Sequence, residues 1–547
     1  MKRIVPLIGM IFVFLIWAAI DYLVLPAWNV QNFGFWVFAG SFIGIEIFLL
    51  LLQFNARGSF GLGLLAGGGI IAIALILSIG SWLIFPGNDT RFFSRLSVED
   101  RNLESWAVDF PGAGTPGPLS QPLVLPAIDK ELSAKIAQGK MGTYGAQFQM
   151  NGEIFTAVAV KRGEGLSLVR ITPLDYSGTM VALFGGSSGT VGYIEVDQQT
   201  EQARLVEVSG GMKYTPGAIL GRDLMRHVRS AYKSALIGGL SFEIDDGGKP
   251  YWVISEVANT IGFFGGKKCV ALILVDPVSG AMERFLPGSQ PAWVDRVIPS
   301  ELVKDMANDA LGLKNGWMNR EFGKKTGVFQ LSDSYNYVVG NDGGEGQTWF
   351  VSGITSPNEA DQTLTGIMMV NLRSAQALRY SFSGITEMRA QEIAENDERV
   401  RAQQLLATWP ILVDVDGQSA YYMFLKNSVQ RQRFVLLDAA TGQKVAMGDT
   451  LAAARSQFVG LMGALAGTSA AVEKIIGTVL RVKDIADGSV LFLLTGDARI
   501  SYQVNGRLSN GAYFLSPGDR VELQFRSSDA NPNERFVSEM RNLTIGE

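Results

Sequence analysis

Three long apolar runs occupy the start of the chain and predict membrane-spanning helices. They cover residues 4–25, 33–53 and 60–85. Each is long enough to cross a bilayer core, which takes about 20 apolar residues in a helix. A cleaved signal peptide does not explain the first run, because its apolar core is too long and two further runs follow it. We therefore expect three transmembrane helices.

The basic residues around these runs predict how the anchor is oriented. Lys2 and Arg3 precede the first run, residues 26–32 contain no lysine or arginine, and Arg57 lies between the second and third runs. Positively charged residues accumulate on the cytoplasmic side of membrane proteins. We therefore expect a multi-pass protein of a bacterial plasma membrane, with a cytoplasmic N-terminus and a large extracytoplasmic part after residue 85.

One carboxylate, Glu46, falls inside the second apolar run. A charged side chain in the hydrocarbon region costs at least about 2.5 kcal/mol unless it is paired, protonated or hydrated. Glu46 is therefore a candidate proton or ion site, or else a neutral side chain that makes one interhelical hydrogen bond. Because the only other carboxylate in the runs is Asp21, near the end of the first, we favour the second interpretation and expect an anchor, not a transporter.

Glycines recur at a spacing of four in two of the apolar runs. Gly40 and Gly44 lie in the second run, and Gly63 and Gly67 lie in the third. Small residues at this spacing let two membrane helices approach closely. The pattern fits packing inside the three-helix bundle, and a homo-oligomer formed through the same glycines stays an open alternative.

Beyond residue 128, short alternations of apolar and polar positions predict β-strands. Four segments of similar pattern stand out, at 193–206, 272–285, 367–380 and 434–447. In each, a β-forming run leads into an Asp or Asn, three turn residues follow, and a second alternating run begins. We interpret all four as β-hairpins.

The two clearest copies, LILVDPVSG and FVLLDAATG, place a Gly four positions after the Asp. An Asp that begins a turn accepts hydrogen bonds from the amides ahead of it, and a Gly supplies the positive φ that closes the turn. Structural rather than catalytic roles are therefore assigned to Asp276, Gly280, Asp438 and Gly442. The other two copies have Glu201 and Ala375 at the Gly position, so a different turn is expected there.

Helical stretches precede three of the hairpins, at 221–236, 301–313 and 386–407. The repeated unit is thus a helix followed by an antiparallel meander, and the helix would cover the apolar face of the sheet. The copies are unequally spaced, which argues against a solenoid with its fixed period. We expect separate α+β modules that pack side by side.

Two of these modules, at about 220–290 and 390–450, resemble the PepSY family. The resemblance rests on the helix, on DDGGKPYWVISEV and on LILVDPVSGAMERF, where that family typically has an acidic-Gly turn, an aromatic strand and a final hairpin. In the family, such modules occur in propeptides of secreted peptidases and in envelope proteins, as binding or inhibitory elements. The resemblance implies protein binding and supplies no catalytic residues.

The C-terminal segment differs from the modules. A helix rich in small residues is followed by long strands that bend at glycines and by the tight-turn sequence SPGD, which together resemble an OB fold, a small β-barrel. Residues 471–547 contain nine Lys and Arg against ten Asp and Glu. Because single-stranded nucleic acid binds in a basic groove, we expect no nucleic-acid partner and interpret the barrel as an interaction or assembly domain.

The overall composition excludes several kinds of chemistry. The formal net charge is -5, and the chain has one histidine, His227, and one cysteine, Cys269. A disulfide within the chain is impossible, and a Cys/His zinc cluster lacks ligands. His227 falls in RDLMRHVRSAYKSAL, which we interpret as a solvated basic helix face. No catalytic residue, cofactor or metal site is predicted.

The fold expected is a membrane-anchored α+β protein with three transmembrane helices, several helix-plus-meander modules and a C-terminal OB-like barrel. The predicted domains are a three-helix anchor (1–86), a Pro/Gly-rich linker (87–128), a first α+β module (129–215), a PepSY-like module (216–300), a third α+β module (301–385), a second PepSY-like module (386–457), and a small-residue helix with the barrel (458–547).

The function expected is that of a non-enzymatic cell-envelope protein whose extracytoplasmic modules bind or scaffold other proteins. Its expected partners are the lipid bilayer and other envelope proteins, with a peptidase as one candidate. Two alternatives follow from the resemblance and the location: a PepSY-type regulator or inhibitor of an extracytoplasmic peptidase, or an accessory subunit of an envelope transport or secretion complex. An enzyme that uses convergent carboxylates is the third class, and only a structure could reveal it.

Overall fold

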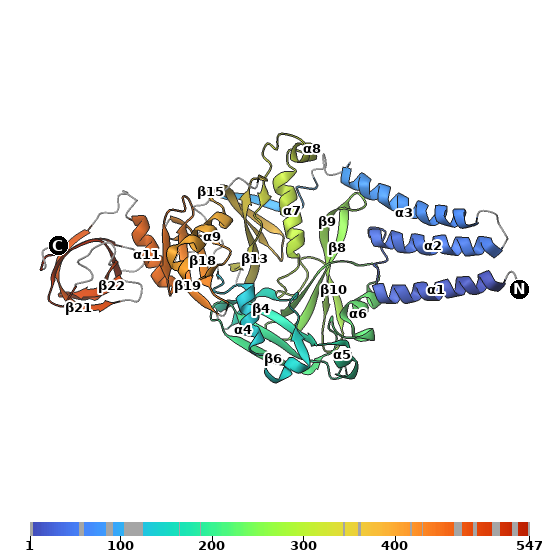
Figure 1. Ribbon diagram of the computed structural model, residues 1–547, viewed down its shortest axis with the longest axis horizontal. Coiled ribbons are helices and arrows are strands. Elements are labelled where there is room, and N and C mark those ends of the chain that lie inside the picture. Colours follow the sequence, from blue (N-terminus) through green and yellow to red (C-terminus); the bar gives the residue numbers. More distant parts are fainter. Residues whose placement is uncertain are drawn as a thin grey trace.

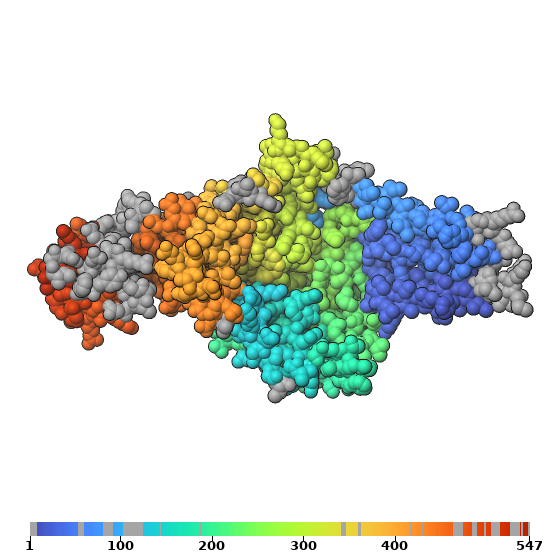
Figure 2. Space-filling model, viewed as in Figure 1, coloured from blue at the N-terminus to red at the C-terminus, as the bar shows by residue number. Residues whose placement is uncertain are grey.

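The predicted α+β class is confirmed in the computed structural model of the chain, where N-terminal helices are followed by four sheets and a β-barrel (Figure 1). The residues that the structure describes are 4–53, 59–83, 91–102, 124–162, 165–185, 187–342, 345–358, 363–415, 418–428, 430–463, 473–484, 489–505, 515–527 and 534–544. The N-terminal helices lie at one end of the long axis and the barrel lies at the other (Figure 2).

Apolar helices form the N-terminal end, namely α1 (Ile4–Val24), α2 (Phe33–Gln53) and α3 (Ser59–Leu83). By length and composition, residues 33–52 and 60–79 can each cross a membrane, whereas the comparable apolar part of α1, Ile8–Val24, is shorter. Many large apolar side chains on these helices are exposed. Apolar helices near the N-terminus are thus confirmed, and three membrane crossings stay a prediction.

Helices α2 and α3 contact each other through the four spaced glycines. A Cβ added to Gly67 would lie 2.6 Å from the carbonyl oxygen of Gly40, and one added to Gly44 would lie 2.9 Å from that of Gly63. The two backbones therefore approach too closely for any larger residue. Packing inside the helix bundle, one of the two interpretations left open by the sequence, accounts for all four glycines.

Each of the four sheets follows a helix in the chain. The first unit consists of α4 (Lys130–Gln138), a short 3₁₀ helix (Gly142–Ala146), β2 (Phe148–Met150), β3 (Thr156–Arg162), β4 (Gly165–Tyr176), α5 (Thr179–Gly185), β5 (Thr190–Asp197) and β6 (Ala203–Met212). The second consists of a 3₁₀ helix (Leu220–Arg222), α6 (Leu224–Ala231), β7 (Leu236–Ile244), β8 (Pro250–Ile261), β9 (Gly265–Val275) and β10 (Met282–Phe285). Their sheet orders are β2-β4-β5-β6, with β3 also paired to β4, and β10-β9-β8-β7.

The third and fourth units repeat the arrangement. The third consists of α7 (Ser300–Gly312), α8 (Trp317–Glu321), β11 (Gln330–Leu331), β12 (Asn336–Asp342), β13 (Glu345–Thr355), β14 (Thr363–Asn371) and β15 (Gln376–Ile385). The fourth consists of α9 (Glu387–Asn396), α10 (Glu398–Ala402), β16 (Leu406–Ala407), β17 (Ile411–Val415), β18 (Gln418–Lys426), β19 (Arg431–Asp438) and β20 (Val445–Gly448). Consecutive long strands pair antiparallel in both sheets, as meanders do.

Part of the predicted linker is not a linker. Strand β1 (Ser97–Asn102) pairs in parallel with β15 and extends the third sheet. Val124 forms a bridge to Val339, and Ile128 is fully buried. The prediction of an extended linker over 87–128 is therefore wrong for these residues, because their backbone groups pair with a sheet. Residues 103–123 lie outside the described part of the chain.

Neighbouring sheets share their hydrophobic cores. One core joins Tyr193 of the first sheet to Trp252 of the second, and another joins Leu272 of the second to Phe350 of the third. A third core joins residues of the third and fourth sheets, including Trp349, Tyr421 and Leu436. Because apolar burial crosses every junction, the four sheets pack as one continuous body rather than as separately folded modules.

The C-terminal barrel has five strands, β21 (Glu473–Asp484), β22 (Ser489–Leu494), β23 (Asp497–Asn505), β24 (Arg520–Ser527) and β25 (Glu534–Asn542). They close in the order β21-β22-β23-β25-β24, with β23 and β25 parallel. Helix α11 (Leu451–Gly463) precedes the barrel, but its Phe458 is buried in the core of the fourth sheet. The predicted boundary at 458 therefore cuts a helix that packs against the fourth sheet.

Candidate functional site

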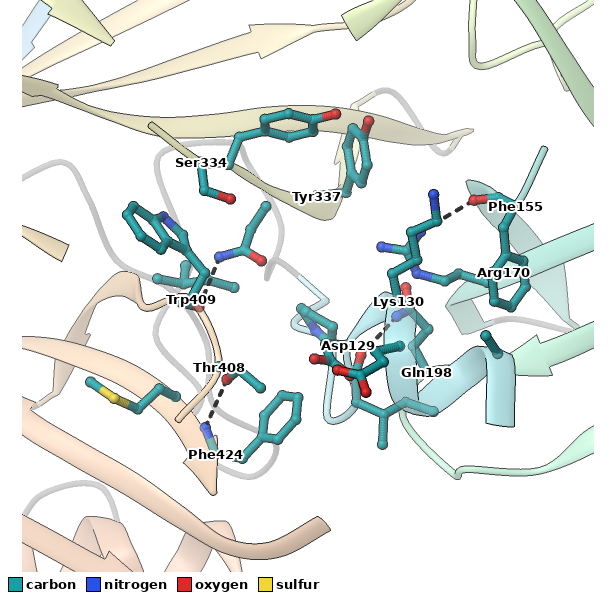
Figure 3. A pocket seen from close by; sticks show the side chains of 18 of the residues that line it. Asp129, Lys130, Phe155, Arg170, Gln198, Ser334, Tyr337, Thr408, Trp409 and Phe424 are labelled. Carbon is teal, nitrogen blue, oxygen red and sulfur yellow. Dashed lines mark hydrogen bonds between the residues drawn. The ribbon is translucent and has the colours of Figure 1, made fainter. Parts of the chain in front are cut away.

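A cavity of about 450 Å³ lies where the first, third and fourth units meet (Figure 3). Arg170 on β4 and Tyr337 on β12 line one side, and Trp409, in the segment between β16 and β17, lies opposite Arg170. A second cavity of about 530 Å³ adjoins it and reaches the second unit at Arg296. The two cavities share six lining residues, namely Lys130, Phe155, Arg170, Ser334, Tyr335 and Tyr337.

The walls of the first cavity are mainly apolar. Phe155 and Met150 come from the first unit, and Trp409, Met423 and Phe424 come from the fourth. Hydroxyl groups of Ser, Thr and Tyr are more frequent around the second cavity, which is lined by Thr156, Ser241, Ser255, Ser300, Ser334, Tyr335 and Tyr337. The combined site thus has an apolar end and a polar end, and such an arrangement is common in sites for small organic molecules.

Two guanidinium groups lie close to the Tyr337 ring. The central carbon of the Arg296 guanidinium lies 4.4 Å from the ring centre, and that of Arg170 lies 5.9 Å from it. The Tyr337 hydroxyl lies 2.6 Å from Ser300 Oγ and accepts a hydrogen bond from Arg296 Nη2 at 3.0 Å. Burial alone would raise the pKa of Tyr337, but the Arg296 charge and these hydrogen bonds bring it below its usual value.

Neither arginine is fully satisfied by the protein. Arg170 Nη1 donates to the Phe155 carbonyl oxygen at 3.3 Å, while its Nε is buried and has no hydrogen-bond partner among the described residues. Arg296 Nη1 is likewise buried without a partner there. Burial lowers the pKa of Arg170 to about 10. That value is still well above neutral pH, so both side chains carry a positive charge.

Three of the carboxylates near the site, Asp129, Glu131 and Glu243, have hydrogen-bond or ion-pair partners other than the two arginines. Asp129 contacts Lys426 Nζ, which also lies 2.7 Å from a Glu131 oxygen. Glu243 is buried and accepts hydrogen bonds from the backbone amides of Asp295 and Arg296 at 2.8 and 3.1 Å. Among the described residues, no carboxylate forms an ion pair with Arg170 or Arg296, although the negative charges of Asp129 and Glu243 act to raise the pKa of Arg170 and of Arg296, respectively.

A buried carboxylate next to the site joins three of the units. Asp295 Oδ2 accepts hydrogen bonds from the Ala159 amide at 2.7 Å and from Thr348 Oγ1 at 2.8 Å, and its Oδ1 pairs with Arg373 Nη2 at 3.0 Å. These partners come from the first and third sheets. Arg296 follows Asp295 in the segment between the second sheet and α7. The hydrogen bonds of Asp295 hold this segment against the first and third sheets, and so help to position the Arg296 guanidinium.

The residues predicted from the sequence lie in turns, away from these cavities. Asp276 Oδ1 accepts hydrogen bonds from the amides of Val278 and Ser279 at 2.8 and 3.2 Å, and Gly280 has a φ of 76°. The Asp438 turn is similar, with its Oδ1 bonded to the Ala440 amide at 3.0 Å. Gly442 has a φ of 71°. This geometry is what the structural assignment requires of Asp276, Gly280, Asp438 and Gly442.

The expectation of a different turn at Glu201 and Ala375 is wrong. Their φ values are 61° and 62°, close to those of the two glycines. Asp197 Oδ1 accepts from the two amides ahead of it, at 2.9 Å each, and Asn371 Oδ1 does the same at 2.8 and 3.0 Å. The side-chain oxygen at the first position and the strand pairing therefore impose this turn even on residues that disfavour a positive φ.

His227 is also placed differently from the solvated position expected. Its ring is half-buried, lies 4.3 Å from the ring of Tyr214, and brings Nε2 to 2.7 Å from the carbonyl oxygen of Gly280. The helix α6 thus packs on the Asp276–Gly280 turn, because an aromatic contact and a hydrogen bond hold the histidine there. A structural role accounts for these contacts.

Glu46 lies on α2, within the apolar end of the molecule. Its Oε1 is buried and has no hydrogen-bond partner among the described residues. The interhelical hydrogen bond predicted for Glu46 is therefore not made by this oxygen. Among the described residues, no group of three or more His, Cys, Asp or Glu side chains is arranged to hold a metal ion.

Sequence reasoning did not single out Arg170, Arg296 or Tyr337. The one signal for Arg170 is its place in LSLVRITPLDY, where a charged residue stands between the apolar residues Val169 and Ile171. Arg296 and Tyr337 carry no comparable signal, because each follows residues of mixed polarity. Their proximity depends on how the units pack, which the local pattern does not encode.

Comparisons with known proteins place the chain in no family. No protein-family model matches it, and no curated protein sequence does. Solved structures of apocarotenoid oxygenase from Synechocystis show a weak similarity: a single-residue mutant is 12% identical with a TM-score of 0.15, and the cobalt-substituted protein is 11% identical with a TM-score of 0.16. Both alignments cover 53% of this chain and 60% of the other. Scores this low carry no argument about fold or function.

Proposed function

We propose that the protein is a non-enzymatic, membrane-anchored cell-envelope protein whose extracytoplasmic body binds or scaffolds other proteins. The observation that carries this proposal is the set of hydrogen bonds and the ion pair that join the apolar helices and the loop between them to the second unit. A body that is fixed to its membrane helices holds its binding surfaces at a set distance and orientation from the bilayer, as a scaffold must.

The junction is made by the loop between α1 and α2. Gln31 Nε2 donates to the Asn259 carbonyl oxygen at 2.8 Å, and Gln31 Oε1 accepts from the Asn259 amide at 3.0 Å. Trp28 donates its amide to the Lys233 carbonyl oxygen at 3.0 Å, and Lys233 Nζ lies 3.3 Å from Asp21. These contacts lie close to the apolar helices. They favour a fixed orientation of the body relative to those helices over attachment through a flexible linker.

The same end of the body exposes apolar side chains. Phe263, at the tip of the β8–β9 hairpin, lies 6.5 Å from the Trp36 ring on α2. Helix α5 lies at the end of the body nearest the apolar helices (Figure 1) and exposes Met180, Leu183 and Phe184. Exposed apolar residues beside membrane helices favour contact with lipid. The lipid bilayer is accordingly part of the proposal, with three crossings and an extracytoplasmic body.

The order of elements in the four units and in the barrel supports the proposed protein binding. The helix-then-meander order of the four units supports PepSY-like modules that bind protein, and the closed order β21-β22-β23-β25-β24 supports an OB-type barrel used for assembly. The near-neutral charge balance of residues 471–547 favours a protein partner over nucleic acid. We propose envelope proteins, a peptidase among the candidates, as partners.

The proposal is tested by cysteine labelling followed by native purification. Cys269, the only cysteine, is buried, so a cysteine introduced at the exposed Ser289 gives a clean signal. We expect an impermeant maleimide to label Ser289→Cys in intact cells, and to label the matched control Arg57→Cys only after lysis. The opposite pattern would refute the orientation. Co-purification of the full-length protein from native membrane should then recover envelope proteins in a fixed ratio, and recovery of the chain alone would refute the scaffold role.

A further inference from the structure

We propose that the two adjoining cavities form a binding site for a small organic oxyanion, a carboxylate or a phosphate ester with an apolar body. The anionic group would bind Arg170 and Arg296, and the apolar body would lie against Trp409 and Phe155. This site goes beyond the scaffold role and does not depend on it.

The guanidinium groups of the two arginines near the Tyr337 ring have no carboxylate of the described chain in direct contact. Among the described residues, neither Arg170 nor Arg296 forms an ion pair. Charges removed from water are costly unless they are paired. The Tyr337 ring stabilises the two cations, but it does not neutralise them. A bound anion would supply the missing negative charge.

Within the described part of the chain, two hydrogen-bond donors of the arginines are left without acceptors. A guanidinium carries five N–H donors arranged in a fork that matches carboxylate and phosphate oxygens. The Nε of Arg170 and the Nη1 of Arg296 are buried without partners among the described residues, and both side chains line the second cavity. Buried polar groups normally have partners, so donors left free beside a cavity point to a ligand that accepts their hydrogen bonds.

The two cavities have the size and lining of a small-molecule site. Its two parts, of about 450 and 530 Å³, are in the usual size range of small-molecule sites, roughly 300–1,000 Å³. Arg170 borders both parts, while Trp409 borders only the first and lies opposite Arg170 (Figure 3). An anion with an aromatic or aliphatic body would therefore place its charge at the arginines and its apolar part toward Trp409.

The charged residues around the cavities bear on which class of ligand can bind. Asp129 and Glu131 are held by Lys426, and Glu243 is held by backbone amides. Lys130 adds a third positive group at the edge shared by the cavities. Glu153 and Glu301 also line the second cavity, so the unpartnered nitrogens of Arg170 and Arg296 are what favour an anion, and a neutral apolar molecule would leave these donors unpaired.

The test uses the full-length protein in detergent and three probes of similar size: phenyl phosphate, phenylacetate and the neutral 2-phenylethanol. Calorimetric titration should detect binding of at least one of the two anions and none of the neutral probe. Phosphate-selective binding would identify phosphate esters as the ligand class, and phenylacetate-selective binding would identify carboxylates. Binding of neither anion, or equal binding of all three probes, would overturn the proposal.

Variants separate a ligand site from a structural one. Arg170→Gln and Arg296→Gln should each weaken anion binding at least about tenfold, because a charge-assisted hydrogen bond is lost. The matched control Arg389→Gln, which removes an exposed arginine paired with Glu392, should leave binding unchanged. Arg296→Lys keeps the charge but loses the fork, and should bind with intermediate affinity.

The melting temperature of the unliganded protein gives the second readout. Because burial disfavours the charged form of Arg170, Arg170→Gln should melt at the same temperature as the original chain or higher, whereas Arg296→Gln also loses hydrogen bonds to Ser300 and Tyr337. A lower melting temperature with unchanged anion affinity would mean that the arginines only support the fold, and would overturn the proposal. Trp409→Ala should weaken phenyl phosphate binding more than it weakens inorganic phosphate binding, since only the former has an apolar body.

Discussion

Two of the four hairpin turns end on glycine and two do not, although all four have the same geometry. Gly280 and Gly442 have φ values of 76° and 71°, and Glu201 and Ala375 have 61° and 62°. In every copy an Asp or Asn oxygen at the first position accepts a backbone amide two residues ahead. The first residue and the strand pairing therefore determine the turn, and the fifth residue determines how much strain it contains.

The surroundings explain why glycine is needed in only two copies. A Cβ on Gly280 would overlap the Tyr214 ring, and one on Gly442 would lie 2.7 Å from Ile393 Cδ1. At the other two turns the side chain has room, and Glu201 uses it to contact Arg431 in the fourth sheet, with a distance of 2.9 Å from Arg431 Nε to Glu201 Oε1. Space as well as φ distinguishes the two pairs of turns.

The largest effect is expected for Gly280→Ala. The new methyl group would combine a disfavoured positive φ with overlap of the Tyr214 ring, and we expect a loss of about 3 kcal/mol in the free energy of unfolding. Denaturant unfolding of the full-length protein in detergent measures it. Gly288→Ala is the matched control, since Gly288 has a φ of 94° but open space around it. It should lose only about 1 kcal/mol, and equal losses would show that space plays no part.

The next effect concerns the first turn residue. Asp276→Ala removes the acceptor of two amide hydrogen bonds and the partner of Lys249, whose Nζ lies 2.9 Å away. We expect a loss of about 1.5 kcal/mol. Asp276→Asn should lose much less, because Asn371 already accepts the same two amides in the third unit. If the Asn variant is as unstable as the Ala variant, the ion pair and not the turn provides the stability.

The pH dependence of stability isolates that ion pair. Burial raises the pKa of Asp276, but hydrogen bonds from Lys249 and from the amides of Val278 and Ser279 outweigh it and leave the pKa below its usual value. A carboxyl whose pKa is lowered on folding stabilises above its unfolded pKa of about 3.9, and loses that contribution as the pH falls through the folded value. The stability difference between the original chain and Asp276→Asn should therefore be present at pH 7 and decrease as the pH falls below the unfolded pKa of about 3.9. If the stability difference between the two proteins does not change with pH, the ion pair between Asp276 and Lys249 is not its source.

The turns also mark the limit of what the sequence can predict. Alternating patterns and Asp-x-x-x-Gly spacing place the hairpins at 272–285 and 434–447, because strand formation and turn chemistry are local. The positive φ of Ala375 is not predictable in this way, since it is imposed by pairing with the neighbouring strands. The contact of Arg170 with the Tyr337 ring is equally hidden, because the two residues belong to different sheets. Strand β1 was missed for the same reason, as its partner lies far along the chain.

A smaller, stabilising effect is expected for Ala375→Gly. Glycine relieves the positive φ, worth about 1–2 kcal/mol for an L-residue, but adds backbone freedom to the unfolded chain, which costs about 0.5–1 kcal/mol. The net gain should be about 0.5 kcal/mol, measured by the same unfolding experiment. Ala281→Gly, at an exposed position without a positive φ, should be destabilising. A loss of stability in both variants would mean that the Ala375 turn is not strained.

The smallest net effect is expected for Glu201→Gly. The substitution relieves the same strain as Ala375→Gly, but it removes the contact with Arg431, a partly buried pair worth about 0.5–1 kcal/mol. The two terms should nearly cancel. A double-mutant cycle separates them: once Arg431→Gln has removed the ion pair, Glu201→Gly should stabilise by about 0.5 kcal/mol, as at Ala375. If Glu201→Gly has the same effect with and without Arg431, the contact between the first and fourth units contributes nothing, and glycine is absent from this turn for another reason.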